Sequence, residues 1–122
     1  MRRSQFERLV AEALDGLPTE FQEKMQNVDV VIKDWPTREE VRRAGLPSGE
    51  TLFGLYQGIP LTKRTSRYGL VLPDMISIYQ GPIEASCRTA EEVRHRVRNV
   101  VMHELGHHFG ISEERLRELG VY

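Results

Sequence analysis

The 122-residue sequence predicts one α+β domain, residues 1–122, in which a sheet of few strands packs on one long helix. Apolar residues recur at helical spacing near both ends of the chain, and two short runs rich in valine and isoleucine lie between them. No repeat, linker or low-complexity segment divides the chain. The expected order of helix, strand, irregular stretch, strand and two helices therefore fits a single compact domain.

The first predicted helix covers residues 4–16, where Ser4 is the expected cap and Glu7 completes a capping box. A second, short helix is expected over residues 19–25. The first helix presents an apolar stripe that indicates a core-facing side, made of Phe6, Leu9, Val10, Ala13 and Leu14.

The middle of the chain supplies the strands. Residues 29–34 and 75–79 are short, rich in β-branched residues and bounded by polar or turn-forming residues, so each is predicted to be a strand. Residues 37–44 are expected to add one or two helical turns. Residues 52–61 carry glycines and a proline, which predict an irregular stretch with an apolar side.

The longest predicted helix starts at Thr89, which has Glu92 three residues on, and ends at Phe109. At about 100° per residue, His107 lies only about 40° from His103 around the helix axis. Val97, Val101 and Leu105 lie on the other side. The helix therefore has one face suited to a core and one that can hold ligands.

Residues 103–107 read His-Glu-Leu-Gly-His, an H-E-x-x-H pattern. Two histidines four residues apart on a helix can bind one zinc ion, and Glu104 beside them is the candidate general base. Gly110 is expected to end the helix, so that the chain turns back under the metal and Glu113 becomes the third ligand. Glu114 and Glu118 are weaker candidates for that ligand, and the alternative for Glu113 is a first-turn acid favoured by the helix dipole.

The chemistry of such a centre, with one Zn²⁺ per chain, is hydrolysis of an amide bond. Zinc lowers the pKa of its bound water toward about 7. Glu104 can take that proton and pass it to the leaving amine. The pattern therefore predicts a zinc-dependent metallopeptidase.

Residues 100–120, from Val-Val-Met-His-Glu to Arg-Glu-Leu-Gly, resemble the end of the small bacterial zincin-like metallopeptidases. Residues 6–18, 52–61 and 72–79 resemble other parts of the same family, so the likeness extends over the whole chain. The resemblance implies a minimal single-domain zincin in which His103, His107 and Glu113 hold zinc and Glu104 is catalytic. It also implies an edge strand that pairs with an extended substrate, and residues 75–79, or the longer stretch that ends at Ile83, are the candidate.

The sequence departs from the wider metzincin pattern at two points. The last ligand position is Glu113, where histidine or aspartate is usual, and no methionine follows Met102 to form a methionine turn. An alternative is therefore a zinc-binding regulatory or interaction module with weak or no catalysis, or an enzyme that needs a partner. A zinc hydrolase acting on RNA is disfavoured by the near-neutral charge and by Glu104.

The amino-acid composition limits the classes of molecule that the protein is expected to bind. The chain has 17 basic and 18 acidic residues, which gives no electrostatic reason to bind nucleic acid or a membrane. Cys87 is the single cysteine, and no signal peptide or membrane span is recognisable. We expect a cytoplasmic protein that acts on a peptide or protein, while the oligomeric state is not indicated.

Four further residues are of types that can serve in a site. Trp35 is expected to pack rather than bind substrate. Tyr79 is expected to pack, with polarisation of the substrate carbonyl as the alternative. His108 is predicted to be a buried, hydrogen-bonded histidine because it points toward the core side of the helix, and His95 is predicted to be structural or exposed.

Overall fold

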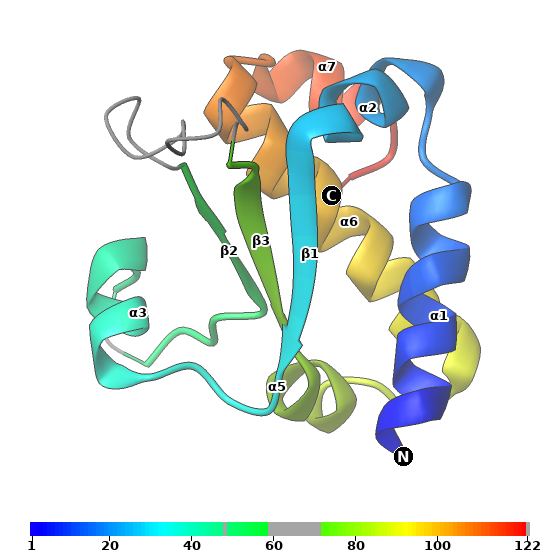
Figure 1. Ribbon diagram of the computed structural model, residues 1–122, viewed down its shortest axis with the longest axis vertical. Helices are drawn as coiled ribbons and strands as arrows, with labels where there is room; N and C mark the ends of the chain where they lie inside the picture. The colour runs from blue at the N-terminus through cyan, green and yellow to red at the C-terminus, as the bar shows by residue number, and fades with distance from the viewer. Residues whose placement is uncertain (48, 59–71, 122) are drawn as a thin grey trace.

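The computed structural model describes residues 1–47, 49–58 and 72–121. Figure 1 shows helices packed around a small sheet, so the α+β prediction is confirmed. In chain order the elements are α1 (Arg3–Asp15), α2 (Thr19–Lys24), the 3-10 turn η1 (Met25–Asn27), β1 (Val28–Lys33), α3 (Arg38–Ala44), β2 (Gly54–Gln57), β3 (Asp74–Tyr79), α5 (Gln80–Ala85), α6 (Ala90–Phe109) and α7 (Glu113–Glu118).

The sheet has the strand order β1-β3-β2. β1 runs parallel to β3, with Val30 opposite Ile76, and β2 runs antiparallel to it, with Leu55 opposite Ser77. The expectation that residues 75–79 form the edge strand is therefore wrong, because β3 has a neighbour on both sides. The edge strand that contacts α6 is β2.

β2 lies in the stretch 52–61 for which the sequence predicts irregular structure, although residues 59–61 fall outside the described ranges. The close approach of β2 to α6 explains the glycine at its start. A Cβ on Gly54 would stand 2.6 Å from Cγ1 of Val100 and 3.0 Å from the carbonyl oxygen of Ser77. Such contacts are too short, so glycine at position 54 lets the strand lie against the helix.

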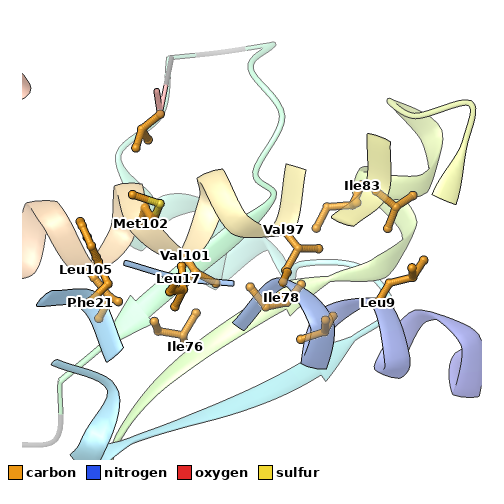
Figure 2. Close-up of a cluster of buried hydrophobic side chains, with 14 of the residues drawn as sticks. Leu9, Leu17, Phe21, Ile76, Ile78, Ile83, Val97, Val101, Met102 and Leu105 are labelled. Atoms are coloured by element: carbon orange, nitrogen blue, oxygen red, sulfur yellow. The ribbon is translucent and has the colours of Figure 1, made fainter. Parts of the chain in front are cut away.

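The core fills the space between the sheet and the two long helices α1 and α6. Figure 2 shows Ile76 and Ile78 of β3 among Val97 and Val101 of α6, with Leu9 of α1 beside them. The predicted apolar stripe of the first helix is buried except for Leu14, which is partly buried and packs against the same core. A smaller cluster on the other side of the sheet joins Leu52, Leu55 and Tyr79 to Ala44 and Leu46.

The residue predicted to cap the start of the helix is correct for α6 and wrong for α1. The Thr89 hydroxyl accepts a hydrogen bond from the Glu92 amide at 3.1 Å, as predicted, although the Glu92 carboxylate binds the N–H of Arg88. α1 starts one residue earlier than expected, and the Arg2 amide donates to the Gln5 side chain at 3.2 Å. The prediction that Ser4 caps this helix is therefore wrong.

The sequence does not predict α5, because Gly81 and Pro82 suggest an interruption of the strand. Pro82 stands in the first turn, where a helix has no use for its missing N–H. The Gly81 amide donates to the carbonyl of Asp34 at 2.8 Å, and the indole of Trp35 covers Gly81 so closely that a Cβ there would overlap it. Trp35 thus packs on the chain, with 63% of its surface exposed.

No helix in the described ranges combines the length and the apolar composition that crossing a bilayer requires. The expected cytoplasmic location stays a prediction.

Candidate metal centre

The C-terminal half of α6 has two faces, as the helical periodicity predicts. Val97, Val101 and Leu105 are fully buried in the core. His103, Glu104 and His107 line a cleft of about 710 Å³ whose other wall is formed by β2 and the segment before it. The same helix therefore joins the core to the candidate site, and its position against the sheet fixes where these side chains lie.

His103 and His107 stand side by side, with ring centroids 4.3 Å apart and ring planes at 77°. Burial lowers the pKa of His103, the neighbouring His107 lowers it further, and Glu113 opposes both. A lowered pKa favours the neutral imidazole, which is the form that binds metal.

Two glycines bring Glu113 back to this pair. Gly110 has a φ of 71° and ends α6 in the left-handed conformation, as predicted. The next amide, of Ile111, donates to the carbonyl of Gly106 at 2.8 Å. A Cβ on Gly106 would lie 3.0 Å from Leu116, so the absence of a side chain at position 106 lets α7 pack closely on α6.

As a result, Oε1 of Glu113 lies 3.7 Å from Nε2 of His107. Tetrahedral zinc with ligands at about 2.0–2.1 Å places its ligand atoms about 3.3 Å from one another, so this separation is near the one required. Glu113 is also the first residue of α7, after the Ser112 hydroxyl that accepts from the Arg115 amide at 3.1 Å. It therefore occupies the first-turn position that the alternative interpretation gave it.

The types of donor atom suit zinc, although the three side chains do not yet surround one point. Within the described ranges, no three His, Cys, Asp or Glu side chains stand in a geometry that would hold a metal ion as placed. Two imidazoles and one carboxylate are nevertheless the donor types that zinc prefers, and His107 is near both His103 and Glu113. Side-chain movements are therefore needed to close the three donors around one centre.

The other two carboxylates considered for the third ligand lie elsewhere. Glu118 forms an ion pair with Arg115 at 3.1 Å and is exposed. Glu114 is exposed, and no described histidine pairs with it. Of the three acids, Glu113 is the one that the structure brings to the histidine pair.

Glu104 lies between the histidine pair and the edge strand. Burial raises the pKa of its carboxyl, while a hydrogen bond from the backbone N–H of Tyr56 and the charge of His107 lower it, and the net direction is upward. A carboxyl group with a raised pKa is better suited to take and return a proton near neutral pH.

A second polar cluster at one end of the cleft is not predicted by the sequence. The hydroxyl of Tyr56 donates to Oδ2 of Asp74 at 2.5 Å, and Nε2 of His108 lies 3.8 Å from the same oxygen. The rings of Tyr56 and His108 stack with centroids 4.0 Å apart. Asp74 is buried, and its position before a predicted strand gives no signal of these partners.

His108 corrects a prediction. It is partly exposed at the rim of the cleft rather than buried in the core. The helical wheel places it toward the core side, but near the last turn of α6 its ring stacks on Tyr56 of β2 and does not enter the core. His95 is exposed, as predicted, and lies within 3.2 Å of the Asn99 side chain.

Tyr79 is fully buried beneath residues that line the cleft and is not itself part of the lining, which confirms the packing interpretation. Its hydroxyl donates to Oε2 of Glu40 at 2.6 Å. Burial opposes the charge of Glu40, but hydrogen bonds from Tyr79, the Thr37 amide and Lys33 outweigh it and lower the pKa of Glu40 to about 2. This network ties α3 to the sheet.

The chain was compared with known protein families, curated sequences and solved structures. No curated protein sequence matches the chain. Among solved structures, a conserved hypothetical protein from Thermo thermophilus is similar, with 25% identity, a TM-score of 0.55, and coverage of 89% of this chain and 94% of that one. A family model described as zincin-like metallopeptidase matches residues 25–121, from η1 to the end of the described chain. That match covers most of the sequence and includes the whole H-E-x-x-H helix, so the chain belongs to the zincin-like metallopeptidase family.

Proposed function

We propose that this protein is a zinc-dependent metallopeptidase that hydrolyses peptide bonds in a peptide or protein substrate. The observation that carries the proposal is the alignment of His103, Glu104 and His107 along one wall of a cleft whose opposite wall includes the edge strand β2. Membership of the zincin-like metallopeptidase family supports the same reaction class.

In this proposal His103, His107 and Glu113 hold one zinc ion. When bound, zinc would polarise the substrate carbonyl and make water acidic enough to lose a proton near neutral pH. Glu104 accepts that proton, and its raised pKa suits it to deliver the proton to the leaving amine.

β2 is the proposed guide for the substrate backbone. It pairs with β3 on one side, and no other strand in the described ranges pairs with its second side. An extended peptide can add to such an edge through main-chain hydrogen bonds, which places successive peptide groups beside the helix. This role replaces the one that the sequence assigned to residues 75–79.

The test is cleavage of a degenerate peptide library by the zinc-loaded protein, with Glu104→Gln run beside it. We expect the wild type to cleave and the variant to be slower by about 10²–10⁴-fold, the usual contribution of a general base. Zinc content should stay at one per chain in both, because Glu104 is not a ligand. Equal rates in the two proteins would contradict the role of Glu104.

One observation favours a second candidate, a zinc-binding module with weak or no peptidase activity. The Glu104 carboxylate already accepts the N–H of Tyr56, an amide of the strand along which a substrate would lie. A partner that moves β2 would then be needed to free the base. Zinc binding without cleavage by the wild type, with or without a partner, would support this candidate over the first. Cleavage that appears only once a partner is added would instead support a peptidase that depends on that partner.

A further inference from the structure

Arg96 lies on the cleft side of α6, seven residues before His103. Both side chains line the same cleft. At about 1.5 Å per residue, seven residues correspond to about 10 Å along the helix. An extended peptide advances about 3.3 Å per residue, so Arg96 stands about three residues along the cleft from the candidate metal centre.

The guanidinium of Arg96 lies over an aromatic ring. Its Cζ lies 4.8 Å from the ring centroid of Phe53, which also lines the cleft. A cation–π contact of this kind needs no hydrogen-bond acceptor, so it leaves N–H groups of the guanidinium available to a carboxylate. The side chain is therefore held in place without the use of its hydrogen-bond donors.

Arg96 differs in this respect from a neighbouring arginine on its own helix and from the second arginine among the described residues that line the cleft. Arg94, two residues earlier on the same helix, pairs with Glu12 and Glu91. Arg43, which also lines the cleft, pairs with Glu39 at 2.8 Å. No carboxylate of residues 1–47, 49–58 or 72–121 pairs with Arg96.

The cleft is also asymmetric in charge. Among the described residues that line it, Glu104 is the single carboxylate, and it lies at the histidine end. Within residues 1–47, 49–58 and 72–121, no carboxylate lines the cleft at the Arg96 end to balance its positive charge. Apolar side chains also line the cleft and lower its local dielectric, which strengthens an ion pair made there; they include Leu46, Leu52, Leu55 and Val100.

We propose that Arg96 determines specificity by binding a carboxylate of the substrate about three residues from the scissile bond. The carboxylate would belong to an acidic side chain or to the C-terminus of the peptide, and the planar guanidinium can bind either with two hydrogen bonds. This inference rests on the proposed peptidase function for the location of the scissile bond.

The test measures binding, so it does not depend on turnover. Zinc-loaded Glu104→Gln protein is titrated into fluorescein-labelled octapeptide pools that have Glu, Gln or Lys fixed at one position, each made as the free acid and as the C-terminal amide. Fluorescence anisotropy gives the affinity. The same titrations are repeated with two double variants, in which Arg96→Gln or Arg96→Glu is combined with Glu104→Gln. The control combines Arg42→Gln with Glu104→Gln, which removes one positive charge from an exposed α3 residue outside the cleft.

We expect the Glu pool to bind about tenfold more tightly than the Lys pool, which is the size of one charge-assisted hydrogen bond. Arg96→Gln should remove the difference, Arg96→Glu should reverse it, and Arg42→Gln should keep it. If the three free-acid pools instead bind equally well, and amidation weakens all three in the Arg96 protein but not in Arg96→Gln, the carboxylate is the C-terminal one. Reversal by Arg96→Glu also shows that the variant is folded.

Two results would overturn the inference. The first is equal affinity for the three free-acid pools and their amides, or no binding of any of them. The second is a preference for the pool that carries the carboxylate that persists in Arg96→Gln. Parallel cleavage assays with the wild-type protein, which keeps Glu104, separate a failure of this inference from a failure of the proposed peptidase function. Cleavage without a charge preference would remove only the role of Arg96. Charge-dependent binding without cleavage would remove only the peptidase activity.

Discussion

The two walls of the cleft differ in how they are built. The α6 wall is a single continuous helix, in which His103, Glu104 and His107 are positioned by local geometry. The β2 wall depends on pairing with β3, a strand that begins 17 residues after β2 ends, and on the close approach of Gly54 to Val100. One wall thus follows from short-range periodicity, and the other from tertiary contacts.

The comparison has a functional consequence. The proposed ligands His103 and His107 and the proposed base Glu104 must keep fixed relative positions, and adjacent turns of one helix provide that. A substrate-binding edge must instead accept another chain, and an edge strand provides unpaired backbone groups. We therefore expect changes in the α6 wall to affect metal and chemistry, and changes in the β2 wall to affect stability and substrate binding.

The largest expected effect is on zinc affinity. Glu113→Ala removes the proposed third ligand and should weaken zinc binding by more than about a hundredfold, since even outer partners of ligands contribute about 10–100-fold. Glu114→Ala, next in the chain and exposed, is the matched control and should leave affinity unchanged. Competition with a zinc chelator measures both. The reverse order of the two variants would move the ligand to Glu114.

The second prediction concerns the β2 wall. In Gly54→Ala the new Cβ would stand 2.6 Å from Cγ1 of Val100, so β2 and α6 must separate, and we expect a loss of about 1–3 kcal/mol in unfolding free energy. Denaturant unfolding measures it. Gly16→Ala, where the nearest atoms would be at 3.6 and 3.7 Å, should change stability by no more than about 0.5 kcal/mol.

A second-site change sharpens this prediction. Adding Val100→Ala to Gly54→Ala removes the side chain that the new Cβ would meet, so the double variant should lose less stability than the sum of the single changes. Additive losses would show that contact between β2 and α6 at this point does not limit packing.

The third prediction concerns the support of the β2 wall. Tyr79→Phe deletes the hydroxyl that donates to Glu40, and loss of a hydrogen bond to a buried carboxylate costs about 1–3 kcal/mol. The folded-state pKa of Glu40, about 2, lies below its ordinary value of 4.5. The network therefore stabilises the fold fully above pH 4.5, and this stability is lost as pH falls toward 2.

In the variant the pKa of Glu40 should rise toward its ordinary value, so stability should depend less on pH below 4.5. Thermal unfolding of both proteins at a series of acidic pH values tests this. A parallel pH dependence in the two proteins would mean that Tyr79 does not hold the carboxylate of Glu40 in its charged form.

The sequence predicts α6, its Thr89 cap and its end at Gly110 because these features depend on residues within a few positions of one another. It also predicts β1 and β3 from their composition. It misses β2 as a strand and therefore gives the edge position to residues 75–79, because pairing partners are set by the fold and not by local sequence. His108 is misplaced for the same reason: its neighbour is Tyr56 of β2.

The central claim is that His103, His107 and Glu113 form one zinc centre beside Glu104. X-ray absorption at the zinc edge of the metal-loaded protein tests it most directly, because the spectrum reports the donor atoms themselves. We expect two imidazole nitrogens with oxygen donors at about 2.0–2.2 Å, and one imidazole fewer in His107→Ala. A sulfur donor at about 2.3 Å, which would have to come from cysteine, or an unchanged spectrum in His107→Ala, would contradict the account.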